Sequence, residues 1–447
     1  MLITHYCNAF NSVKVNRTVI ACDPWVGAGD EIGWISYPLH KNGANVLKSI
    51  KPNFVYISHL HTDHLDPKTL SKINKNTKII IKKFIDQRLK RKILKLGFYN
   101  IIECEAWKKY KLNKDISIGI VPQISSNMSG MPEQINYDVD TSIVIQSNIS
   151  KEVFYNGVDN PLTVNSHKLV KKFITKHFNK KIAVAVLQDG GNGEYPQCFL
   201  NINRDKEKER IVNGALLATK GKLDIMKPEA YISPMPNMIM FGKYSKLQKY
   251  VPKPTFAQEE KILKNDKYKI HHIAGGGTLT KKNGKWVSKK TKSKFVFKKI
   301  FKKYSNKKYF YSNDFKNVSI QEIDKAFLQS HVNYIKKLNR LPIKTHWDVE
   351  FYIYRNLTIN SKGKINFKNS KFLRKYAIKY NKSNGKLLKK NYSKLKCHLD
   401  SNLFYGLLIK KYTNWSQPLA GSLILYERKP NIFDPNIVFS LNYLSIF

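Results

Sequence analysis

Three histidines and an aspartate occupy six residues near the start of the chain, in the order His59-x-His61-x-Asp63-His64. They follow an apolar, β-branched run at 54–57 that is typical of a buried strand, so the histidines are expected at that strand's carboxyl end. Imidazole nitrogens and carboxylate oxygens are the ligands that borderline divalent ions such as zinc prefer. The spacing therefore predicts a metal site in the turn after this strand.

An aspartate after an earlier strand could support that site. The segments Leu2–Tyr6 and Arg17–Cys22 are predicted to form two antiparallel strands joined by a polar turn at 11–16. Asp23 ends the second strand and precedes Pro24, which favours an extended backbone for the aspartate. Its carboxylate can then orient a metal-ligating histidine of a neighbouring loop. The alternative is an aspartate that only opens a turn.

Strands and helices alternate through the first half of the chain, which suits two mixed sheets packed face to face with helices outside. The expected strands lie at 78–81, 101–104, 116–121, 141–145, 152–155, 182–187 and 230–232, and the expected helices at 84–96, 166–178 and 206–219. Asp159 lies in the turn after the strand at 152–155. The glycines Gly190 and Gly191, with Tyr195 nearby, could offer backbone N–H groups to a phosphate or sugar, although such a loop can also be an ordinary turn.

The composition describes a folded and strongly basic protein. Its 447 residues include 79 Lys+Arg and 32 Asp+Glu, a formal net charge of +47, and 42% of the residues are hydrophobic. Such a surplus attracts polyanions such as nucleic acid, anionic lipid headgroups or phosphorylated substrates. No apolar run approaches the roughly 18 to 20 residues that span a bilayer, so we expect a cytoplasmic protein. The five cysteines have no CxxC spacing, which indicates neither a disulfide framework nor a cysteine metal site.

The second half differs from the first. After Lys243 the sequence is rich in lysine and aromatic residues, and the stretch 280–308 holds no acidic residue. Asn283-Gly284 within it is a hairpin signal. We expect either a hairpin that faces nucleic acid or phosphate, or a solvated basic strand pair with one face in the core. The chain is accordingly divided into a metal-binding region at 1–245 and a basic region at 246–447 that packs on the first and completes the active-site cleft.

The ordered motifs resemble a known family. Asp23, the His59 to His64 motif and Asp159 look like the first, second and fourth signature elements of the metallo-β-lactamase fold. Further segments resemble the non-Rieske part of CMP-N-acetylneuraminate hydroxylase and its bacterial relatives: 23–25 with 33–34, 190–199, 276–279 and 428–433. The resemblance implies the α/β (α+β) class, with a metallo-β-lactamase-type αββα sandwich and a lysine-rich C-terminal extension or second domain.

Two departures from this family concern its metal centres. A Rieske iron-sulfur cluster needs Cys-x-His and Cys-x-x-His pairs, and the chain has neither, so a hydroxylase-like reaction would need a separate redox partner. The family pattern also supplies histidines where this chain has Gln123 and Met235. The resemblance then implies one ion on His59, His61 and Asp159 and another on Asp63, His64 and Asp159, with His271 or His272 as replacement ligands.

The implied function is a metal-dependent hydrolase with one or two divalent ions, zinc first and iron or manganese as alternatives. Asp63 would orient or deprotonate the attacking water, and Asp23 would hold a ligand imidazole in place. Gly190, Gly191 and Tyr195 are the candidate substrate contacts, and the positive charge agrees with an anionic small molecule such as a nucleotide sugar. The alternatives are a nuclease or RNA-binding member of the fold, and a non-enzymatic relative with a degenerate metal site.

Overall fold

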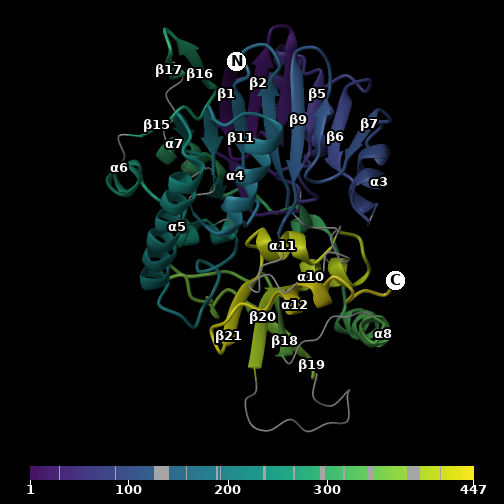
Figure 1. Ribbon diagram of the computed structural model, residues 1–447. Helices are drawn as coiled ribbons and strands as arrows, with labels where there is room; N and C mark the ends of the chain where they lie inside the picture. Colours follow the sequence, from purple (N-terminus) through teal and green to yellow (C-terminus); the bar gives the residue numbers. More distant parts are fainter. Residues whose placement is uncertain are drawn as a thin grey trace.

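Two large sheets form the centre of the molecule (Figure 1). The computed structural model describes residues 1–447 except 30, 86, 125–139, 158, 188–189, 192, 235–237, 265–266, 292–296, 316–317, 341–346, 380–392 and 413. The first sheet has the order β17-β16-β1-β2-β3-β5-β6-β7. Its strands are β1 (Leu2–Cys7), β2 (Phe10–Val15), β3 (Thr18–Cys22), β5 (Phe54–Tyr56), β6 (Lys78–Lys82), β7 (Ile101–Cys104), β16 (Gly277–Lys282) and β17 (Lys285–Lys289).

The second sheet packs against the first and has the order β15-β13-β12-β11-β10-β9-β8. Its strands are β8 (Lys109–Lys111), β9 (Ile116–Val121), β10 (Ser142–Ser147), β11 (Val153–Asn156), β12 (Val184–Val186), β13 (Ala230–Ile232) and β15 (Lys269–His271). The inner faces of the two sheets share one apolar cluster, to which Ile3, Val13 and Ile20 contribute from the first sheet and Ile118, Ile143 and Phe154 from the second. Because β-branched and aromatic side chains alternate toward this layer, their burial stabilises the pairing of the sheets.

Helices cover the outer faces of both sheets. On the second sheet, Val170, Leu216 and Leu263 come from three helices and pack with Val144 and Tyr231; the helices are α4 (Ser166–His177), α5 (Arg204–Met226) and α6 (Phe256–Leu263). The first sheet is covered by α1 (Val46–Ile50), α2 (Pro67–Leu70) and α3 (Arg88–Lys95). The predicted αββα sandwich is confirmed.

A smaller four-stranded sheet, of order β19-β18-β20-β21, lies in the C-terminal region. Its strands are β18 (Trp347–Arg355), β19 (Lys371–Ile378), β20 (Ser393–Asp400) and β21 (Leu425–Lys429). The other elements of the second half of the chain are η3 (Gly242–Tyr250), α7 (Phe297–Tyr304), η4 (Phe310–Asn313), α8 (Ile320–Leu338), α10 (Ser401–Leu408), α11 (Ser416–Ala420) and α12 (Pro435–Leu441). One apolar cluster joins Trp25 and Trp34 of the first half to Phe351 and Trp415 of this region. A short pair, β4 (Trp34–Ser36) with β14 (Met238–Met240), and the turn η1 (Gly43–Asn45) complete the elements.

The sandwich extends past the predicted boundary at 245/246, because β15, β16 and β17 pair into its two sheets. The division of the chain into a metal-binding region at 1–245 and a basic region at 246–447 remains a prediction. The hairpin at Asn283-Gly284 is confirmed, and both turn residues have positive φ, +48° and +76°. All five cysteines are free and buried. No helix in the described part of the chain is long and apolar enough to cross a membrane.

The two strands predicted at 2–6 and 17–22 are present as β1 and β3, but the prediction that a polar turn joins them into an antiparallel pair was wrong. The segment at 11–16, expected to be a polar turn, belongs mostly to β2, which lies between β1 and β3 and pairs with both. Val13 and Val15 face the core, and the Oδ1 of the buried Asn11 side chain accepts a hydrogen bond from His5 Nδ1 at 2.8 Å. This buried partner satisfies the polar side chain, so a residue typical of turns is tolerated inside a strand.

Replacement of Trp415 should destabilise the whole fold. Its ring is 1% exposed, lies 5.4 Å from the Phe351 ring, and its Nε1 donates to Leu444 O at 3.0 Å. We expect Trp415→Ala to lower the free energy of unfolding by about 3 kcal/mol, since it leaves a cavity and an unpaired carbonyl. Urea denaturation checks this, with Tyr99→Ala as control because Tyr99 is 77% exposed; equal unfolding curves for the two variants would contradict it.

Candidate metal centre

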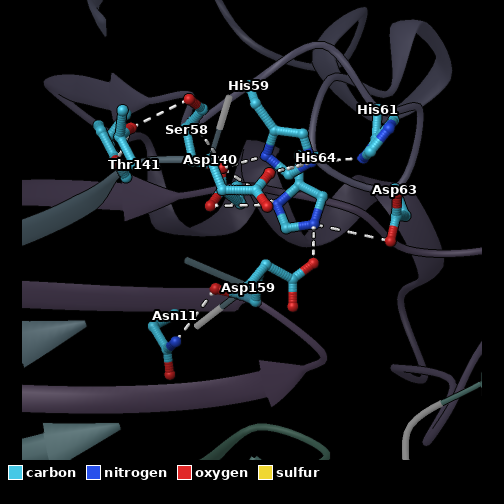
Figure 2. Close-up of polar contacts among 12 residues, drawn as sticks. Asn11, Ser58, His59, His61, Asp63, His64, Asp140, Thr141 and Asp159 are labelled. Atoms are coloured by element: carbon cyan, nitrogen blue, oxygen red, sulfur yellow. Dashed lines mark hydrogen bonds and ion pairs between the residues drawn. The ribbon is translucent and has the colours of Figure 1, made fainter. Parts of the chain in front are cut away.

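Strand ends from both sheets meet at one end of the sandwich and bring acidic and imidazole side chains together. β3 and β5 run parallel, so Asp23 and the loop that begins at Ser58 leave the first sheet at the same edge. β10 and β11 are antiparallel, so Asp140, just before β10, and Asp159, just after β11, leave the second sheet together. Figure 2 shows the resulting cluster. The fold therefore places residues that are far apart in sequence around one centre.

His59 and His61 form one half of the cluster with Asp140. His59 Nε2 lies 2.7 Å from His61 Nδ1 and 3.1 Å from Asp140 Oδ1. His59 Nδ1 is already hydrogen-bonded to Ser58 Oγ at 2.9 Å, which orients the ring and leaves Nε2 for the centre. Two imidazole nitrogens and a carboxylate oxygen thus converge from three positions in the chain.

His64 forms the other half with two aspartates. Its Nε2 lies 2.7 Å from Asp159 Oδ2 and 3.6 Å from Asp63 Oδ2. His59, His64 and Asp159 also have ligand atoms within 4.8 Å of one another. His64 is therefore the point at which the motif after β5 meets the loop after β11.

Asp23 holds the motif loop in position through its side-chain carboxylate. Its Oδ1 accepts from the Ser58 backbone N–H at 2.7 Å, and its Oδ2 lies 3.2 Å from His64 Nδ1. The predicted orienting contact to a histidine is thus present, but the predicted extended backbone was wrong, because Asp23 has φ +43°. Its N–H donates to Tyr56 O at 2.9 Å, and these three contacts together hold a conformation that a residue before proline rarely adopts.

Burial and neighbouring charges shift the pKa values of His59 and His64 in opposite directions. Burial lowers the pKa of His59 well below its usual range, and the rings of His64 and His61 add to that effect. Burial acts on His64 in the same sense, but Asp63, Asp23 and Asp159 outweigh it and raise the pKa of His64 well above its ordinary value. Burial also works against the Asp159 carboxylate, whose pKa is nevertheless held below its usual value, chiefly by His64. At neutral pH these shifts favour the neutral form of His59 and the protonated form of His64.

The donor set fits a divalent ion. His59, His61 and Asp140 have ligand atoms within 4.8 Å of one another, and they combine two imidazole nitrogens with one carboxylate. Three protein ligands of these types leave a coordination position for a further ligand, as in catalytic zinc sites. The imidazole and carboxylate donors thus support the predicted divalent metal.

The structure adds one potential ligand that the sequence prediction missed and groups another differently. Asp140 stands beside His59 and His61, where Asp159 was expected, while Asp63 and Asp159 do lie near His64 as predicted. β10 pairs with β9 so that Ser142 faces Val121, which brings Asp140 to the edge where a histidine was expected near Gln123. An aspartate two residues before a strand that pairs with β9 was the available signal. Met235, the other expected histidine position, lies outside the described residues.

His271 and His272 are not brought to this cluster. His271 ends β15, is 2% exposed, and burial with the charges of Lys269 and His272 lowers its pKa to about 4. His272 Nδ1 lies 3.4 Å from Glu259 Oε2, and its ring packs on Phe256. Neither joins a described group of potential ligands.

The glycine-rich loop has a packing role at the predicted positions. A Cβ on Gly190 would lie 2.9 Å from Pro252 O, and one on Gly191 would lie 2.7 Å from Pro252 Cγ. The Tyr195 hydroxyl donates to Glu207 Oε2 at 2.6 Å and accepts from Asn431 Nδ2 at 2.8 Å. The contacts of these three residues are thus within the protein, whereas Gly193 of the same loop lines the pocket beside the metal ligands.

A pocket of about 420 Å³ opens beside the cluster and is built from both halves of the chain. Its lining includes His61, Asp63, Asp140 and Asp159, the first-half residues Ile32, Trp34, Pro161, Gly193 and Met238, and the C-terminal residues Gln417, Ala420, Gly421 and Phe433. Thr62 of the motif loop donates to Gln417 Oε1 at 3.3 Å, and the Gly33 N–H donates to Gly421 O at 2.8 Å. A Cβ on Gly33 would lie 2.8 Å from Gly421 O, so this seam requires glycine.

Comparisons with known proteins agree with the resemblance read from the motifs. No family model matches the chain. It is 28% identical over 153 residues to cytidine monophosphate-N-acetylneuraminic acid hydroxylase of Asterias rubens, a match that covers 32% of this chain and 21% of the enzyme. It is also 28% identical over 125 residues to the "Putative Rieske 2Fe-2S iron-sulfur protein" of Mycobacterium tuberculosis, which covers 27% of this chain and 24% of that protein. The chain thus spans about a quarter or less of these relatives.

Among solved structures, similar ones include the metallo hydrolase Igni18 of Ignicoccus hospitalis, with 17% identity, a TM-score of 0.41, and coverage of 65% of this chain and 99% of that one. The diiron β-hydroxylase CmlA of Streptomyces venezuelae has 13% identity, a TM-score of 0.40, and coverage of 61% and 52%. The topology and the ordered motifs of the chain itself support the fold assignment. The chain has a metallo-β-lactamase-type αββα fold and resembles the non-Rieske part of CMP-N-acetylneuraminate hydroxylase.

Proposed function

We propose that this protein is a metal-dependent hydrolase. The observation that carries the proposal is the convergence of His59, His61 and Asp140, with His64 and Asp159 beside them, at the wall of a pocket. Zinc is the proposed ion because imidazole and carboxylate donors suit it, with iron and manganese as alternatives. A bound divalent ion supplies Lewis acidity, which lowers the pKa of water from ~15.7 to about 7.

The two halves of the cluster differ in whether a histidine must lose a proton before an ion can bind. His59 is kept neutral by burial, so it offers a lone pair without first losing a proton. His64 carries a proton that Asp159 and Asp23 stabilise, and that proton must leave before Nε2 can act as a ligand. The first ion is therefore assigned to His59, His61 and Asp140, and a second, where present, to His64, Asp63 and Asp159.

Asp63 is the proposed proton acceptor. Its carboxylate lines the pocket and is one of the charges that hold the proton on His64. A carboxylate in that place can accept a proton from a water molecule that attacks a substrate held in the pocket. Asp23, with its contacts to Ser58 and His64, keeps the motif loop in position and takes no part in proton transfer.

The proposed substrate is an anionic small molecule such as a nucleotide sugar. The formal charge of +47 supports attraction of anions, and Lys253 lies close enough to Asp159 to contribute to its lowered pKa. The apolar side of the pocket, with Trp34, Met238 and the 61% exposed Phe433, suits an uncharged ring of the same substrate. A hydroxylase-like reaction at this site would draw electrons from a separate redox partner.

Metal analysis tests the ligand assignment. Protein loaded with zinc at neutral pH and desalted should hold close to one ion per chain by mass spectrometry. His61→Ala and Asp140→Asn should each lose most of it, because each removes one of three protein ligands, whereas His177→Ala should keep it. A protein that holds no metal under any loading condition, or equal loss in all three variants, would contradict the proposal.

The second equivalent of zinc should bind more tightly as pH rises. The raised pKa of His64 means that the ion competes with one proton, so the second affinity should increase about tenfold from pH 6.5 to 7.5. The first equivalent should change less, since burial already keeps His59 neutral. Calorimetry in two buffers of different ionisation enthalpy counts the released protons, and a second equivalent that releases none would contradict the assignment of His64.

Loss of Asp63 should separate metal binding from turnover. Asp63→Asn should keep the first zinc equivalent and lower kcat by roughly 10² to 10⁴, the range for a general base. The assay is hydrolysis of a panel of aryl esters, aryl phosphodiesters and nucleotide sugars by the zinc-loaded protein. Asp205→Asn, on α5 and outside the pocket lining, is the control, and an Asp63→Asn variant with unchanged kcat would exclude the proposed role.

A further inference from the structure

A second, larger concavity lies at the open edge of the sandwich. It measures about 770 Å³ and is lined by Glu229, Glu260, Lys264, Lys267, Tyr268, Lys269, Ile270, Gly284, Lys285 and Trp286. β17 and β15 are the edge strands of the two large sheets on this side, and α6 lies next to them (Figure 1). We call this concavity the lysine groove. It shares no described lining residue with the pocket beside the metal ligands.

Four lysines line the groove, and all four side chains are exposed: Lys264, Lys267, Lys269 and Lys285. Of its two carboxylates, Glu229 is engaged within the protein, by Lys281 Nζ at 2.8 Å and Trp286 Nε1 at 2.8 Å. Glu260 lies 4.0 Å from His272 Nε2. The exposed charge that the groove presents is therefore mainly positive, and an anionic ligand would complement it.

The hairpin gives the groove its outer rim. Asn283 and Gly284 form the turn between β16 and β17, and their positive φ values bring Lys285 to the start of β17 beside the groove. The sequence from 280 to 308 has no acidic residue, so the charges within the hairpin are all positive, and Glu229 outside it pairs with Lys281. This is the basic segment that the sequence singled out as a possible nucleic-acid or phosphate contact.

The aromatic residues act as the floor of the groove. Trp286 is 7% exposed and Tyr268 is 6% exposed, and the Tyr268 hydroxyl donates to Leu263 O at 2.7 Å. Their rings are thus committed to packing, and base stacking is not what the groove offers. The flexible lysine amines are the groups that meet a ligand, and they recognise charge rather than sequence.

We propose that the lysine groove binds the phosphodiester backbone of a nucleic-acid strand. A strand carries regularly spaced negative charges that several lysines can neutralise at once, and a concave groove suits a strand better than a flat membrane surface. RNA and DNA share this backbone, and the ribose hydroxyl distinguishes them. The site is independent of the metal centre.

Fluorescence anisotropy with labelled U20 RNA and dT20 DNA tests the proposal on the whole 447-residue chain. With four lysines in contact, log K should fall with log[salt] with a slope near −3, so affinity falls about 50-fold from 50 to 200 mM salt. Lys269→Ala/Lys285→Ala should lower affinity at least tenfold at 50 mM salt and reduce the slope to about −1.4. Equal affinities for the two strands identify the backbone alone, and tighter RNA binding adds contacts to ribose.

The matched control is Lys362→Ala/Lys364→Ala, which removes the same charge from two exposed lysines outside the groove. It should keep the affinity and slope of the unmodified protein, and His61→Ala should do the same. Equal losses in the two lysine pairs would show diffuse attraction to the +47 chain and overturn the proposal. So would the absence of strand binding at 50 mM salt, with or without binding to phosphatidylserine vesicles.

Discussion

The convergence of three carboxylates on one buried imidazole is the constraint on which the metal centre depends. Asp23, Asp63 and Asp159 all act on His64, and the three carboxylates in this corner of the fold together favour a positive charge on its ring. In the metal-free protein the His64 imidazolium provides that charge. A divalent ion can take over this role, so the geometry of the loop is maintained by electrostatics whether a proton or an ion is bound.

That corner is supported by the sandwich below it and closed by the C-terminal region beside it. The strand ends that supply the ligands belong to two sheets whose facing sides form one apolar layer. The pocket wall comes from α11 and the segment after β21. Gln417 of α11 contacts Thr62 of the motif loop, and Gly421 contacts Gly33, which lies just before β4. A mutation in this wall can therefore alter the site without touching a metal ligand.

Features that depend on local residue patterns could be predicted from the sequence. Features that depend on the pairing of distant segments could not. The αββα layers, the hairpin at Asn283 and the cluster around His64 follow from periodicity and from one dense motif. Asp140 was missed because its role arises from the register of β10 on β9, which no local pattern reports. The strand β2 was mistaken for a turn because the burial of Asn11 against His5 satisfies a residue that usually avoids strands. Asp23 has a left-handed backbone because its tertiary hydrogen bonds outweigh the local preference before proline.

The pocket wall on the far side of the glycine seam is synthesised later than the ligand-bearing loops. The last strand of the sandwich ends at Lys289, whereas Gly421 and Phe433 follow more than a hundred residues later. At ribosomal rates of about 5 to 20 residues per second, the ligand-bearing loops and both large sheets are synthesised several seconds before the pocket wall exists. The C-terminal wall of the pocket is therefore added to a sandwich whose ligand-bearing loops have already been synthesised.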